Sequence, residues 1–145
     1  MENQDLNYTI LRNCYKNAQM AILSLDEVIE IANGSLKQDL ISQRSGYDKL
    51  MTKMSDIAHA LNIELPTVNE FQKGMLTASI NIKTIADDSN SHVAEMTLKG
   101  TIMGLTELIR DISDYSHILK PEVLTCLEEV KDFEEKCEAE LKKHL

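Results

Sequence analysis

The sequence contains no tryptophan, and only two phenylalanines and four tyrosines occur among its 145 residues. Proteins that hold single-stranded nucleic acid stack its bases on aromatic side chains, so such a surface is missing here. Positive charge is also scarce, because 15 lysines and arginines stand against 24 aspartates and glutamates and give a formal net charge of −9. The phosphates of DNA and RNA require a basic surface. We therefore expect no nucleic-acid partner.

Long apolar runs, cysteine pairs and catalytic motifs are missing as well. No stretch approaches the roughly 18 consecutive apolar residues of a membrane helix, and residues 1–7 have no feature of a secretory signal. The three cysteines form no Cys-x-x-Cys pair, which is typical of reduced thiols in the cytoplasm. There is no Gly-x-Ser-x-Gly, no phosphate-binding glycine loop and no His-Glu-x-x-His. We expect a cytoplasmic protein without a membrane span, and the missing motifs argue against an enzyme without excluding one.

What is present is a helical pattern interrupted by only two prolines and five glycines. Apolar residues recur at steps of three and four, which places them on one face of a helix, and no stretch alternates like a strand. Asn33-Gly34 is so short a link that the helices on either side must be antiparallel. We expect one all-α domain, 1–145: an up-down-up-down four-helix bundle with an additional short helix between the second and third long helices. The long helices are predicted over about 6–32, 36–61, 89–112 and 121–141, and the short one over 71–85.

The third long helix is the most apolar and is expected at the centre of the bundle. One stripe of it should face the core, namely Ala94, Leu98, Ile102, Leu105, Ile109 and Ile112. A second set points the opposite way, namely Val93, Met96, Gly100 and Met103. Gly100-x-x-x-Gly104 predicts close approach of another helix, because each interior glycine costs about 1 kcal/mol relative to alanine. We expect the short helix and a second copy of the chain to cover this other face, which predicts a homodimer through the central helix.

The order of a helical hairpin, a proline-led connector, a short helix and a second hairpin resembles that of small bacterial ferritin-like four-helix bundles of unknown function. The segment Ser-Asn-Ser-His-Val-Ala-Glu-Met-Thr-Leu-Lys-Gly-Thr-Ile-Met-Gly-Leu-Thr-Glu, residues 89–107, carries the specific part of this resemblance. It implies a ferritin-like fold and no particular function. Ferritin-like enzymes and stores bind two metal ions through a Glu on each of two helices and a Glu-x-x-His on each of the other two.

This chain departs from that metal-binding pattern on its helices. Asp56-x-x-His59 lies off the apolar stripe and should face solvent, and His92-x-x-Glu95 has the motif in reverse. Glu134 faces inward, but the residue three positions later is a cysteine where a histidine is required. Glu95, His92 and Glu134 are therefore the candidate metal ligands. We expect no cofactor, and iron or another divalent metal ion is the alternative.

Glu134 is the most informative single residue, because a carboxylate on a core stripe needs a partner or a raised pKa. Its candidate partners are Arg44, Gln43, Tyr15 and Tyr47. Cys14 and Cys137 are expected at similar heights in antiparallel helices, either as small core residues or as a redox pair.

Three functions are compatible with these patterns. The first is a non-catalytic cytoplasmic helical-bundle interaction protein that self-associates. The second is a ferritin-like metal-binding protein with a degenerate or non-standard site. The third is a carrier of a small apolar ligand in a methionine-lined cavity, based on Met51, Met54, Met75, Met96 and Met103. Methionine also serves as an ordinary core filler, so we expect the first function.

Overall fold

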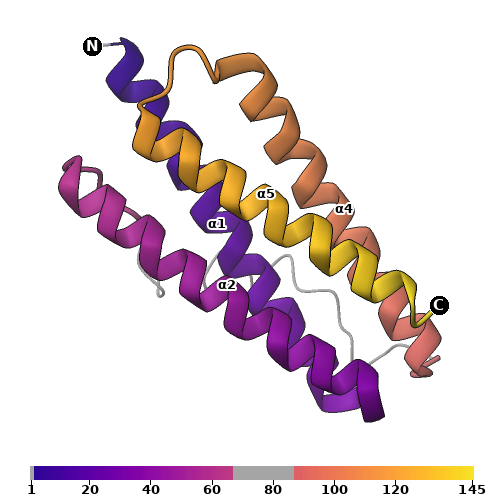
Figure 1. Ribbon diagram of the computed structural model, residues 1–145. Coiled ribbons are helices and arrows are strands. Elements are labelled where there is room, and N and C mark those ends of the chain that lie inside the picture. Colours follow the sequence, from indigo (N-terminus) through magenta and orange to yellow (C-terminus); the bar gives the residue numbers. More distant parts are fainter. Residues whose placement is uncertain (1, 67–86) are drawn as a thin grey trace.

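The computed structural model describes residues 2–66 and 87–145, which form a bundle of long helices (Figure 1). They are α1 (Glu2–Ile31), α2 (Gly34–Ala60), α4 (Asn90–Tyr115) and α5 (Pro121–Lys142). In these two ranges every regular element is a helix, so the all-α four-helix bundle predicted from the sequence is confirmed. The short helix predicted over 71–85 lies outside the described residues.

Local sequence explains where the helices begin and turn. Gly34 has φ +58°, a left-handed backbone angle that glycine adopts without the steric cost of a side chain, and it lets the chain reverse within two residues of α1. Ser89 caps α4, because its hydroxyl oxygen accepts the backbone N–H of His92 at 3.3 Å. Pro121 is placed in the first turn of α5, where its missing N–H has no intrahelical partner to lose.

The direction of α4 differs from the strict alternation predicted from the sequence. At the start of α4, Asn90 accepts the backbone N–H of Asn33 at 3.0 Å and donates to its carbonyl at 2.9 Å. At the other end, the backbone N–H of Lys120 donates to the side chain of Asn7 at 2.9 Å. Helix α4 therefore begins beside the start of α2 and runs parallel to it, and the order is up-down-down-up (Figure 1).

The predicted alternation is thus right within each hairpin and wrong between the hairpins. Helix α2 has 27 residues and a length of about 40 Å at 1.5 Å per residue. Residues 61–89 connect its far end to the start of α4 at the opposite end of the bundle, and a segment of that length can span the distance even at helical rise. The sequence interpretation placed a short helix over 71–85 in this connection, but it did not allow for a crossover along the length of the bundle. A single long crossover is the connection found in ferritin-like bundles.

The core-facing side of α4 is rotated from the predicted one. Ala94, Leu98 and Leu105 are buried as expected. Ile102 and Ile109, expected in the core, are 39% and 42% exposed. Their places are taken by the residues Val93, Thr101 and Leu108, which are buried. Thr101 is tolerated inside because its hydroxyl donates to the Thr97 carbonyl at 3.0 Å, so hydrophobicity alone misplaces this face. In the part of the chain that the structure describes, no helix combines the length and apolar character needed to cross a membrane.

Candidate functional site

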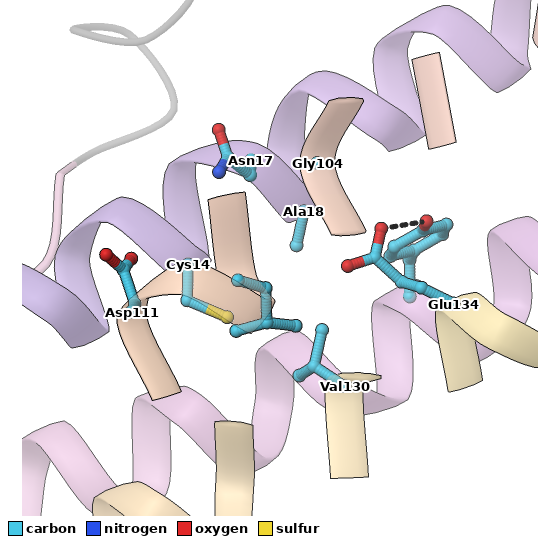
Figure 2. Close-up of a pocket in the computed structure, with 9 residues that line it drawn as sticks. Cys14, Asn17, Ala18, Gly104, Asp111, Val130 and Glu134 are labelled. Carbon is cyan, nitrogen blue, oxygen red and sulfur yellow. Dashed lines mark hydrogen bonds between the residues drawn. The ribbon is translucent and has the colours of Figure 1, made fainter. Parts of the chain in front are cut away.

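Among the residues that the structure describes, the buried carboxyl group at the centre of the bundle is that of Glu134 on α5. Its side chain is 7% exposed, and its Oε2 accepts a hydrogen bond of 2.9 Å from the hydroxyl of Tyr47 on α2 (Figure 2). Both residues lie on the apolar stripes of their helices, so the helical period turns both inward. The predicted burial of Glu134 and its predicted pairing with Tyr47 are confirmed.

Burial controls the protonation of this pair. Because the interior disfavours a charged carboxylate, desolvation raises the pKa of Glu134 to about 7, and the hydrogen bond from Tyr47 opposes part of that rise. Desolvation and the neighbouring Glu134 raise the pKa of Tyr47 far above its ordinary value. Tyr47 is therefore a permanent hydrogen-bond donor, and Glu134 can gain or lose a proton near neutral pH.

A small cavity lies beside the carboxyl group of Glu134. Figure 2 shows Cys14, Asn17 and Ala18 of α1 around it, with Gly104 and Asp111 of α4 and Val130 of α5. The space open to the centre of a water molecule is about 10 Å³, which is roughly the minimum for a single water. A Cβ at Gly104 would lie 3.4 Å from Oε2 of Glu134, which is an ordinary van der Waals contact, so Gly104 borders the cavity without being required by the packing. The cavity is too small for an apolar ligand, and of the two carboxyl groups that border it, those of Asp111 and Glu134, only that of Glu134 is buried.

The Tyr47 ring is held in place by a second contact that the sequence interpretation missed. The ring of Phe133 packs edge-on against it, with ring centroids 4.9 Å apart and an interplanar angle of 87°. Phe133 fits because Gly46 has no side chain: a Cβ at Gly46 would lie 2.2 Å from Cε2 of Phe133. The lone glycine inside the helical pattern was the available signal, since a glycine costs helix stability there and can have a packing reason.

The other predicted partners of Glu134 bind elsewhere. Arg44 forms an exposed ion pair with Asp26 of α1, in which its Nη2 lies 3.3 Å from Oδ2. Gln43 is buried, but its Nε2 donates to the carbonyl of Cys137 at 3.5 Å. The side chain of Arg44 is long enough to carry its guanidinium out to solvent, where the charge stays hydrated. The prediction of Arg44 as a partner of Glu134 is therefore wrong.

The candidate metal ligands are not brought together. His92 and Glu95 lie on the surface of α4, with Nδ1 and Oε2 3.8 Å apart, and Glu95 also contacts Lys99 at 3.3 Å. Glu134 lies inside the bundle. Asp56 and His59 are exposed, as their helical phase predicted. Within residues 2–66 and 87–145, no three histidine, cysteine, aspartate or glutamate side chains lie close enough to hold one metal ion. The donor set described here therefore does not fit the ferritin-like two-metal site.

The three cysteines, Cys14, Cys126 and Cys137, are free and buried. Burial raises the pKa of Cys126 to about 11 and that of Cys137 to about 12, and raises that of Cys14 well above its ordinary value. Helices α1 and α5 run parallel, with Lys120 at the start of α5 beside Asn7 of α1. Cys14 therefore lies near the start of this shared length and Cys137 near the end of α5, so the predicted juxtaposition of the two is wrong. Cys126 instead contributes to the raised pKa of Cys14. Their prediction as small core residues is confirmed.

The outer side of α4 is the second candidate site. Ile102, Met103 and Ile109 are 39%, 74% and 42% exposed, although isoleucine and methionine are usually buried. Gly100 is also exposed, and a Cβ there would meet no heavy atom within 4 Å. Gly100 and Gly104 therefore do not form one strip for close helix packing within the chain, because Gly104 faces Glu134 and Gly100 faces outward. Packing of this strip against a second copy stays a prediction.

Comparisons with known proteins support the fold alone. No family model matches the sequence, and no curated protein matches it. Among solved structures, Dps92 from Deinococcus radiodurans is similar with a TM-score of 0.78 and 13% identity, over 99% of this chain and 87% of that one. YcfI from Rhodopseudomonas palustris, for which a structural role is suggested, has a TM-score of 0.64 and 20% identity, over 97% and 92%. At these identities the likeness establishes a ferritin-like bundle fold and no activity.

Proposed function

We propose that this protein is a non-catalytic helical-bundle interaction protein of the cytoplasm that self-associates through the exposed side of α4 around Ile102 and Met103. The observation that carries the proposal is the exposure of Met103, which is 74% accessible, with Ile102, 39% exposed, beside it on the same side of the helix. An apolar patch of this kind usually marks a contact surface. A two-fold dimer, in which the patch meets its own copy, is the commonest assembly of soluble proteins.

The small number of buried polar groups supports a non-catalytic role in which the surface of the protein makes the functional contacts. Glu134 is the one acid among the buried polar residues that the structure describes, the others being Asn7, Gln19, Gln43 and Thr101. Acid–base catalysis requires a substrate within hydrogen-bonding reach of the catalytic group, and the cavity beside Glu134 has room for about one water. The alternative function, a ferritin-like protein with a degenerate metal site, would rest on Glu134 alone. The suggested structural role of YcfI is compatible with a bundle that acts by association.

The strength of the association follows from the size of the patch. The apolar part of this patch is small, so the burial that drives association is limited. Association also costs about 4 kcal/mol or more in lost freedom of motion. We therefore expect a weak, reversible dimer, which must be studied at high protein concentration.

The test compares two variants by size-exclusion chromatography with light scattering, over a concentration series. Met103→Ser removes the most exposed apolar side chain of α4 and should lower the dimer fraction strongly. Ile41→Ser is the matched control, because Ile41 is 45% exposed on α2, away from the proposed contact, and should leave the dimer unchanged. Equal mass for the parent and the Met103→Ser protein at every concentration would refute the proposal.

A further inference from the structure

We infer that the second copy lies antiparallel across α4, with the two-fold axis between Ile102 and Met103, so that Glu95 of each copy faces Arg110 of the other. The inference rests on the proposed self-association and adds the orientation and register of the two copies.

The residues that would make this contact share one side of α4. At 100° per residue, six residues of α4 lie within an arc of about 100°. Along the helix, Ile102 and Met103 form the apolar centre of this set, and charged residues lie toward both of its ends. The structure places all six at the surface: Glu95, Lys99, Ile102, Met103, Thr106 and Arg110. This set, called the outer face of α4 below, runs along four turns of the helix and is long enough to meet a second helix along its length.

The order of residues along the outer face is complementary to itself in reverse. When identical helices pair antiparallel about an axis between positions 102 and 103, each position faces the one equally far beyond the axis. Ile102 then faces Met103 at the centre, and Lys99 faces the neutral Thr106. Glu95 faces Arg110 at both ends, each about 11 Å from the axis at 1.5 Å per residue. Apolar groups thus meet in the middle and opposite charges meet outside.

Parallel pairing of the same face lacks this complementarity. With the axis along the helices, each side chain lies near its own copy, so that Glu95 meets Glu95, Lys99 meets Lys99 and Arg110 meets Arg110. Like charges held together across an interface oppose association. The exposed charges of α4 therefore favour the antiparallel arrangement, while the apolar centre supplies affinity in either one.

Of the two charged residues that would pair between copies, Glu95 already has ion-pair partners in its own chain, whereas Arg110 has none among the described residues. Glu95 is contacted by Lys99 at 3.3 Å and by His92 at 3.8 Å. Arg110 is exposed and has no ion pair within 4 Å among the described residues. In the antiparallel pair, Glu95 would be flanked by Lys99 of its own copy and Arg110 of the other. Exposed ion pairs contribute little affinity each, so these charges select the register.

Charge reversal tests the pairing directly, with the dissociation constant of the full-length dimer measured by sedimentation equilibrium. Arg110→Glu alone places two acids opposite each other at both ends, and Glu95→Arg alone places two bases there. Each should weaken the dimer about tenfold at low salt. The double variant Glu95→Arg/Arg110→Glu restores opposite charges and should recover parent affinity to within about threefold. An equimolar mixture of the two single variants should also recover it, because each end of the mixed dimer then pairs opposite charges.

Cross-linking reports the direction of the second copy independently. A cysteine introduced as Met103→Cys lies beside the axis and should form an intermolecular disulfide under mild oxidation. A cysteine introduced as Ser113→Cys lies on the same side of α4 but far from its own copy in the antiparallel pair, and should not. The native cysteines are buried.

The outcomes separate this inference from the proposed function. A monomeric parent refutes self-association itself. If the parent is a dimer that Met103→Ser weakens, either of two results refutes the antiparallel register and leaves the proposed function in place. One is a dimer whose affinity does not change on charge reversal, and the other is an intermolecular disulfide in the Ser113→Cys protein.

Discussion

The hydroxyl of Tyr47 on α2 lies 2.9 Å from Oε2 of Glu134 on α5, and this hydrogen bond joins the two hairpins at the level of the central cavity. The carboxyl group it holds has a pKa of about 7. A buried group that is half charged at neutral pH links the stability of the bundle to pH.

The first prediction is that Glu134 makes the folded protein less stable as pH rises. The ordinary pKa of the group is 4.5, and folding raises it to about 7, so the folded state prefers the protonated form. The contribution is greatest below about pH 4.5 and is lost as the pH rises through about 7. By linkage the loss is about 3 kcal/mol. Glu134→Gln cannot ionise and should abolish this component of the pH dependence in urea denaturation at pH 5 and pH 8.

Glu134→Ala serves as the contrasting variant. It leaves the Tyr47 hydroxyl without its partner and enlarges the cavity, which should cost roughly 2–4 kcal/mol at pH 5. The cost should be smaller at pH 8, where the parent already bears the charged carboxylate. If Glu134→Gln follows the same stability-against-pH curve as the parent, Glu134 is not the titrating group and this account of the site is wrong.

The second prediction contrasts two helical glycines with opposite environments. Gly46→Ala places a Cβ against the ring of Phe133, which must then shift from its contact with Tyr47, and should destabilise the protein by about 1–2 kcal/mol. Gly100→Ala adds a Cβ in open space and should stabilise the protein by about 0.5–1 kcal/mol, because alanine is the better helix former. Thermal denaturation of both variants gives the two signs. A stabilised Gly46→Ala protein would contradict the packing described at Gly46, and a destabilised Gly100→Ala protein would contradict the open space at Gly100.

The helices and the inward position of Glu134 could be predicted because both follow from a local period of 3.6 residues. The direction of α4 could not, since it depends on the bonds between Asn33 and Asn90, which are 57 positions apart. The phase of α4 failed at Thr101, whose hydroxyl bonds to its own helix. The helical pattern also gives no sign of the contact of His144, whose Nε2 lies 2.7 Å from Oδ2 of Asp39 and whose side chain is 16% exposed. Contacts between distant residues leave no mark in a helical pattern.

The third prediction concerns metal. Protein purified without chelator should contain less than one equivalent of iron, manganese or zinc per chain. The reason is that the candidate ligands His92 and Glu95 lie on the surface, away from Glu134, and one carboxylate alone binds such ions weakly. Elemental analysis by mass spectrometry provides the measurement. A stoichiometric di-iron centre, verified by its absorption spectrum, would contradict the separation of these ligands described above.

The central claim, self-association through the outer face of α4, is tested most directly by sedimentation equilibrium of the parent protein up to about millimolar concentration. The account predicts a mass that rises reversibly from 16.4 kDa toward twice that value, and a Met103→Ser protein that stays near the mass of one chain. A parent mass of 16.4 kDa at every concentration would contradict it.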